Sequence, residues 1–248
     1  MRINQPTTAS QWVSVVATII STLIFLAFTL NYLLLFILTG VGLIRFGMFL
    51  CCLGYYFFML ILGPKHHWGF IFLEVFLIFI GSTFLSAWST GFSSKTQWRY
   101  GFQKKYIENS GSSYVDYFPD KLPEFISYYS FDYQKAVMQG DGHASLSFIA
   151  DDKLVDKYIK EYSKDAIYTF EVSKGANITP QTVSPEAIQE VKDDTTLRVY
   201  FDEDFWGADK ENATVYVFSA VHYFNHPSSS ALIIDKKTNK IQFGKYSS

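Results

Sequence analysis

Two histidines four residues apart, His222 and His226, are the first candidates for chemistry. On a helix this spacing places both imidazoles on one face, as in zinc sites where Glu follows the first His. Here Tyr223 follows, and the run to Pro227 is typical of a strand entering a turn. Residues four apart in a strand are separated by about 13 Å. We therefore predict no metal and no cofactor. The metal-binding alternative would use His143, His222 and His226.

An acidic segment between Asp202 and Glu211 imitates a calcium-binding loop. Counted from Asp202, a glycine falls at the sixth position, as in an EF-hand. The fifth position is Trp206 and the twelfth is Ala213, where the EF-hand pattern requires oxygen ligands. We therefore expect an acidic loop facing solvent rather than a calcium site.

The distribution of charged side chains divides the sequence into two parts. Residues 11–90 contain only Arg45, Lys65 and Glu74. Such a segment would expose wide apolar surface in water, but it suits the interior of a bilayer. Residues 91–248 carry 18 Lys and Arg against 22 Asp and Glu. This mildly acidic part lacks the basic stripe that binds phosphates, so nucleic acid is not expected as a partner.

A membrane region of three transmembrane helices, with the lipid bilayer as partner, is the resulting prediction, because each span needs about 20 residues. Arg45 would lie at the turn between the first two spans and extend to the headgroups. Glu74, an acid within a span, would extend to the interface or pair there with Lys65, His66 or His67, and a role in a proton relay is the alternative. The expected parts are an N-terminal tail at 1–11, a transmembrane region at 12–90 with spans at about 12–38, 43–62 and 69–89, a juxtamembrane linker at 91–113 and a soluble domain at 114–248.

Three spans would place the N-terminus and the soluble domain on opposite sides of a cell membrane. The Lys and Arg residues between Lys95 and Lys105 favour a cytoplasmic domain by the positive-inside rule. Large C-terminal domains nevertheless cross membranes largely regardless of charge. This one is rich in Tyr, Ser, Thr and Asn and contains no Cys. We expect a multi-pass membrane protein with an extracytoplasmic domain, and a cytoplasmic domain is the alternative.

The soluble domain shows the periodicities of a mixed fold. Residues 144–149 alternate as in a strand. Residues 153–164 repeat apolar side chains on one helical face, after a capping Asp151 or Asp152. These patterns predict an α+β domain with an antiparallel sheet packed against one main helix. Further strands are expected at 166–173, 196–202, 213–224, 231–235 and 241–246, and a short helix from Ser184 to Val191.

Several short motifs follow one order in residues 118–248. They are Leu122-Pro123, an aromatic stretch, Gly140-Asp141-Gly142 with Phe148 after it, the helix, and the hairpin from Ile234 to Ile241. This order resembles that of uncharacterised surface-anchored domains, often lipoproteins, of Gram-positive bacteria. The resemblance implies an extracytoplasmic location and no activity. The chain departs from these domains in its three expected spans and in lacking a lipidated cysteine.

The function expected from these patterns is binding. The chain contains no nucleophile elbow and no phosphate-binding glycine loop, so we do not expect an enzyme. The domain is expected to bind a protein partner in the envelope or membrane, or another envelope component. Two alternatives stay open: a small envelope enzyme or metal-binding protein that uses the three histidines, and a subunit of a larger membrane complex.

Overall fold

The computed structural model describes residues 9–41, 47, 50, 54, 91–136, 140–172, 199–223 and 226–247. The chain forms two compact units, residues 1–90 and 91–248. In the first unit the structure describes one long helix, α1 (Ala9–Thr39), which ends at Gly40 with a positive φ of 80°. The second unit contains the sheet and the other described helices.

The described part of the first unit does not support the expected membrane region. Among the described residues, no helix has both the length and the apolar character needed to cross a bilayer. This finding contradicts the three-helix transmembrane fold class and the multi-pass cell-membrane localisation, and the argument about orientation depended on both. The prediction rested on the scarcity of charge. Charge alone is an incomplete criterion, because uncharged polar residues also lower the apolar character of a helix.

The second and third expected spans lie outside the described residues, apart from a few isolated positions. Arg45, Lys65 and Glu74 also lie outside them.

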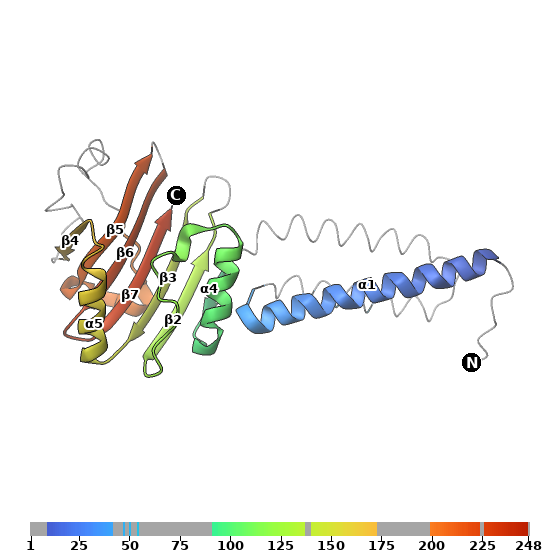
Figure 1. The fold of residues 1–248 in the computed structure, drawn as a ribbon, viewed down its shortest axis with the longest axis horizontal. Helices are drawn as coiled ribbons and strands as arrows, with labels where there is room; N and C mark the ends of the chain where they lie inside the picture. Colours follow the sequence, from blue (N-terminus) through green and yellow to red (C-terminus); the bar gives the residue numbers. More distant parts are fainter. Residues whose placement is uncertain are drawn as a thin grey trace. The chain divides into compact units, whose positions relative to one another are not determined.

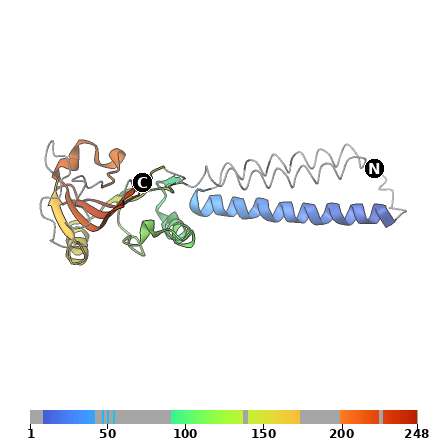
Figure 2. The ribbon, with the colours of Figure 1, turned by 90° about the horizontal axis from the view of Figure 1, so that it is seen from above.

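The second unit is built on one seven-stranded antiparallel sheet with the strand order β1-β2-β3-β7-β6-β5-β4. Figures 1 and 2 show α4 and α5 on one face of this sheet and α7 on the other. The strands are β1 (Phe92–Ser94), β2 (Ser127–Gln134), β3 (Gly142–Ile149), β4 (Tyr168–Glu171), β5 (Thr214–Tyr223), β6 (His226–Asp235) and β7 (Lys240–Ser247). The helices are η2 (Gln97–Arg99), α4 (Tyr100–Asn109), η3 (Ser113–Val115), α5 (Asp152–Tyr162), α7 (Glu203–Trp206) and η4 (Gly207–Asn212).

An aromatic core fills the face under α4 and α5. Phe131 of β2, Phe148 of β3 and Phe243 of β7 are fully buried there. The ring of Tyr100 on α4 lies 5.4 Å from that of Phe131, and the ring of Tyr158 on α5 lies 5.7 Å from that of Phe243. Burial of large aromatic side chains on this scale dominates the stability of a small domain.

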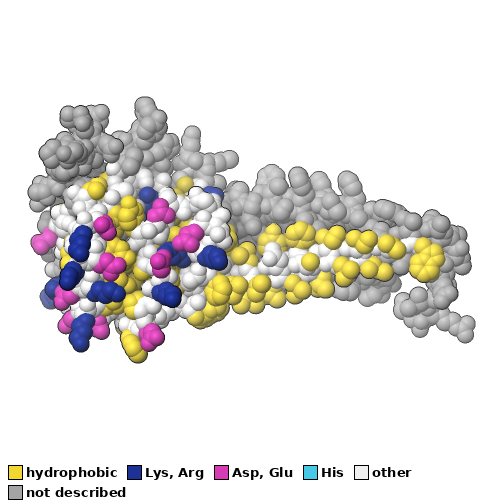
Figure 3. Space-filling model, in the orientation of Figure 1, with side chains coloured by type: hydrophobic (Ala, Val, Ile, Leu, Met, Phe, Trp, Pro, Cys, Tyr) yellow, Lys and Arg dark blue, Asp and Glu magenta, His cyan; other side chains and the backbone are white. Residues whose placement is uncertain are grey.

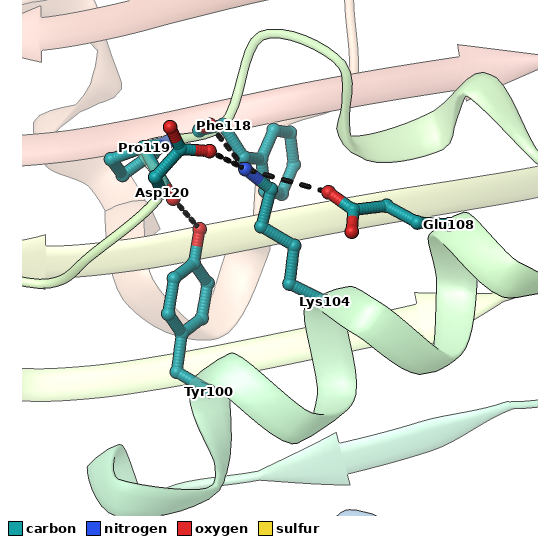
Figure 4. Close-up of polar contacts among 6 residues, drawn as sticks. All are labelled: Tyr100, Lys104, Glu108, Phe118, Pro119 and Asp120. Carbon is teal, nitrogen blue, oxygen red and sulfur yellow. Dashed lines mark hydrogen bonds and ion pairs between the residues drawn. The ribbon is translucent and has the colours of Figure 1, made fainter.

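Residues 91–113 belong to the same compact unit as the sheet. β1 pairs with β2, and α4 is anchored to the chain segment after η3 (Figure 4). Lys104 donates to the carbonyl oxygen of Phe118 at 3.1 Å and pairs with Asp120 at 2.6 Å. Tyr100 donates its hydroxyl to the carbonyl oxygen of Pro119 at 2.5 Å. The compact unit therefore begins at Gly91, before the start near Tyr114 expected from the sequence, because contacts across 14 to 19 residues leave no periodic signal.

The opposite face of the sheet has a second apolar core. Residues from β4, β5 and β6 pack there against Trp206 of α7, which is 1% exposed. Partly buried side chains of the segment 199–205 cover it further. This segment therefore crosses the sheet. A strand was predicted at 196–202, but the described residues of that range, 199–202, do not form one. The predicted helix from Ser184 to Val191 lies outside the described residues.

Two local predictions in the domain are confirmed. The helix expected at 153–164 is α5, and its N-cap is Asp151, whose carboxylate accepts from the amide of Leu154 at 2.8 Å. The hairpin expected before β7 is closed by Asp235, whose carboxylate accepts from the hydroxyl of Thr238 at 2.6 Å. On the side that carries α4 and α5, acidic and basic side chains are interspersed (Figure 3).

Candidate functional site

Seven side chains gather where the segment 199–202 crosses β2, β3 and β7, on the face opposite α4 and α5. We call this group the polar cluster. It consists of Asp132, His143, Ser145, Ser147, Tyr200, Asp202 and Gln242. Side chains alternate between the two faces of a strand, so His143, Ser145 and Ser147 share this face while Leu146 and Phe148 fill the aromatic core. The strand pairing then places Asp132 and Gln242 beside them.

Gln242 fixes the crossing segment to the sheet. Its side-chain oxygen accepts from the backbone amide of Asp202 at 3.1 Å and from the indole N–H of Trp206. Its side-chain nitrogen donates to the carbonyl oxygen of Tyr200 at 2.9 Å. Gly244 allows the close approach, because a Cβ there would lie 3.1 Å from the same carbonyl oxygen. One fully buried glutamine thus satisfies three groups between Tyr200 and Trp206.

Asp202 is a buried carboxyl group at the N-terminus of α7. It is 8% exposed, and it accepts from the hydroxyl of Ser147 at 3.2 Å and from the amide of Phe205 at 3.2 Å. Burial raises the pKa of Asp202, and the nearby carboxylate of Asp132 raises it further. The hydrogen bonds oppose this rise in pKa without cancelling it.

His143 and Tyr200 form a stacked pair at the partly exposed end of the polar cluster. Their ring centroids are 4.2 Å apart and the rings lie within 11° of parallel. Burial lowers the pKa of His143 and so favours the neutral imidazole, although Asp132 and Asp202 oppose this effect. Burial, followed by the charge of Asp202, raises the pKa of Tyr200 to about 12. The pair therefore presents a neutral aromatic surface.

Two further side chains complete the polar cluster. Asp132 is half-buried and accepts from the hydroxyl of Ser130 at 2.8 Å. Ser145 is fully buried between His143 and Ser147 on β3, and its hydroxyl has no hydrogen-bond partner among the described residues. A buried hydroxyl without a partner is uncommon in folded proteins, and an ordered water is one way in which it is satisfied.

The structure brings together two of the residues singled out from the sequence, His143 and Asp202. It leaves His222 and His226 elsewhere, on β5 and β6 at their hairpin, where Tyr223 pairs with His226. Within the described part of the chain, no three His, Cys, Asp or Glu side chains are placed to hold a metal ion. Asp202 caps α7 rather than opening a solvent-facing loop.

Sequence reasoning missed the other five residues of the polar cluster, which are Asp132, Ser145, Ser147, Tyr200 and Gln242. The alternation of residues 144–149 did place both serines on the face away from the core. It could not show what covers that face, because the segment 199–202 is about 55 residues distant, as the Ser147–Asp202 hydrogen bond shows. No local pattern in the sequence indicates that Gln242 belongs to a site.

Comparison with known proteins identifies no family for this chain. No protein-family model matches the chain, and no curated protein or solved structure matches it. The resemblance of residues 118–248 to surface-anchored bacterial domains therefore stays a prediction, and the function is argued from the polar cluster itself.

Proposed function

We propose that residues 91–248 are a binding module that holds a protein partner by one of its basic side chains, inserted at the polar cluster. The observation that supports this proposal most is the sign of the charge around the site. The charged groups that shift the pKa values of Asp202, His143 and Tyr200 are carboxylates. These carboxylates come from Asp132, Asp202, Glu203 and Asp204. A cation from outside would relieve their mutual repulsion.

Arginine suits this arrangement better than lysine. Its planar guanidinium can stack on an aromatic ring while it donates two parallel hydrogen bonds to one carboxylate. The ring of Tyr200 and the half-buried carboxylate of Asp132 offer these two contacts at the same end of the polar cluster. Stacking of a cation on an aromatic ring contributes about 0.5–2 kcal/mol, depending on how far it is desolvated.

A nuclear magnetic resonance titration of the full chain tests the proposal. The probe is a blocked Gly-Arg-Gly tripeptide, and the comparison peptide is blocked Gly-Glu-Gly. We expect the ring resonances of His143 and Tyr200 to shift and saturate with the arginine peptide only. Equal shifts with both peptides, or none with either, would contradict the proposal.

A matched pair of variants locates the interaction. Asp132→Asn removes the half-buried carboxylate of the polar cluster, and Asp165→Asn removes an exposed carboxylate after α5. We expect the first to abolish saturation by the arginine peptide and the second to preserve it. Equal weakening in both variants would mean that the peptide responds to net charge and not to this site.

A further inference from the structure

Two polar side chains lie side by side on the other face of the sheet, the face under α4 and α5. Lys245 of β7 shares that face with Phe243, and its cross-strand partners are Ala144 on β3 and Ser230 on β6. Lys245 is half-buried, Ser230 is 3% exposed and Ala144 is fully buried. Lys245 and Ser230 are therefore cross-strand neighbours on a partly buried part of this face. Ala144, on the other side of Lys245, has only a methyl side chain.

Neither polar group has a partner within the part of the chain that the structure describes. The hydroxyl of Ser230 forms no hydrogen bond there. The ammonium group of Lys245 forms no hydrogen bond or ion pair there either. Burial lowers the pKa of Lys245, and Asp116, an exposed residue just after η3, opposes this only in part. A cation and a hydroxyl are both donors, so an acceptor that carries negative charge would satisfy the two together.

We propose that Lys245 and Ser230 form a binding site for a small carboxylate, distinct from the polar cluster on the opposite face. The ammonium group supplies the charge, and the serine hydroxyl supplies the second hydrogen bond. A single negative charge matches the single cation. A phosphate dianion would be repelled by Asp116, the acid that already acts on Lys245.

Access to the site depends on the lysine side chain. Lys245 is partly exposed, whereas the hydroxyl of Ser230 is buried. The four rotatable bonds of a lysine allow the ammonium group to move aside and return over a bound anion. The bound carboxylate would favour the charged form of Lys245 and raise its pKa.

The reactivity of Lys245 toward a dilute amine-acylating reagent measures this change in pKa. Only the neutral amine reacts, so the rate falls about tenfold for each unit by which an anion raises the pKa. The full chain would be labelled at pH 8 in chloride, acetate or phosphate at equal ionic strength, and the modified peptides would be quantified by mass spectrometry. We expect acetate to slow acylation of Lys245 relative to chloride. The exposed Lys237 is the internal control and should react equally in all three.

Variants separate a site at Ser230 from simple screening of charge. Ser230→Ala should remove most of the acetate effect at Lys245, whereas Ser230→Thr, which keeps the hydroxyl, and Ser93→Ala on β1 should retain it. Asp116→Asn should strengthen the effect, because it removes the acid that competes for the lysine. Equal rates in acetate and chloride, or a stronger effect of phosphate than of acetate, would overturn the carboxylate site. So would an acetate effect that persists in Ser230→Ala.

Discussion

The side-chain oxygen of Gln242 accepts a hydrogen bond from the backbone amide of Asp202, 40 residues earlier in the chain. Through this contact β7 holds Asp202, the N-cap residue of α7, in place against the sheet. The same glutamine serves Trp206 and Tyr200, so the polar cluster and the second apolar core depend on one buried amide group.

Replacement of Gln242 by leucine should therefore be costly despite the similar size of the two side chains. It would leave the indole N–H of Trp206, the amide of Asp202 and the carbonyl of Tyr200 without their partner. At about 1–3 kcal/mol for each unsatisfied buried group, we expect a loss of about 3 kcal/mol or more in the free energy of unfolding. Urea denaturation followed by tryptophan fluorescence measures it. Gln134→Leu, at an exposed position of β2, is the control and should cost less than about 0.5 kcal/mol.

Asp202 should make the stability of the domain depend on pH. Because its pKa is raised in the folded state, the folded protein binds this proton more tightly than the unfolded chain does. The stabilisation is fully present below the unfolded pKa of about 3.9 and is lost as the pH rises through the folded pKa.

The variant Asp202→Asn keeps the N-cap and removes this titration. The difference in unfolding free energy, wild type minus variant, should therefore decrease as the pH rises from about 4 toward 7. Urea denaturation at several pH values measures it, with Asp165→Asn as the control for an exposed charge. A difference that stays constant with pH, or that increases, would mean that Asp202 is not the responsible group.

Lys104→Met should loosen the attachment of α4. The methionine fills the space of the lysine stem but leaves the carbonyl of Phe118 without its donor. We expect a loss of about 1–3 kcal/mol in unfolding free energy and faster amide hydrogen exchange in α4. The neighbouring Lys105 is exposed, and Lys105→Met should change neither quantity. Unchanged exchange in Lys104→Met would show that the aromatic contacts alone hold the helix.

Replacement of glycine by alanine should have opposite effects on stability at Gly142 and Gly101. At Gly142 a Cβ would collide with the hydroxyl of Tyr114 and with the backbone nitrogen of Ala136, so Gly142→Ala should destabilise the domain. At Gly101, on the exposed side of α4, a Cβ meets nothing within 4 Å. Gly101→Ala should raise the unfolding free energy by about 0.5–1 kcal/mol through helix propensity. Thermal denaturation of both variants checks the two signs.

The sequence by itself determined the elements whose signals are local. The apolar face of α5 and its capping Asp151 lie within a dozen residues, and so does the hairpin closed by Asp235, because helix periodicity and turn chemistry act over short separations. The scarcity of charge in residues 11–90 is equally plain in the sequence. It led to a membrane region that the described helices do not support, because charge is only part of what a bilayer selects.

Only the tertiary structure decided the polar cluster and the extent of the domain. His143 and Asp202 both attracted attention in the sequence, but they meet because β3 pairs with β7 and Gln242 then holds the crossing segment over both strands. α4 joins the domain through Lys104 and Tyr100, which bind backbone carbonyls that every sequence possesses. Contacts of this kind depend on which distant residues the sheet brings together, and no pattern along the chain encodes that pairing.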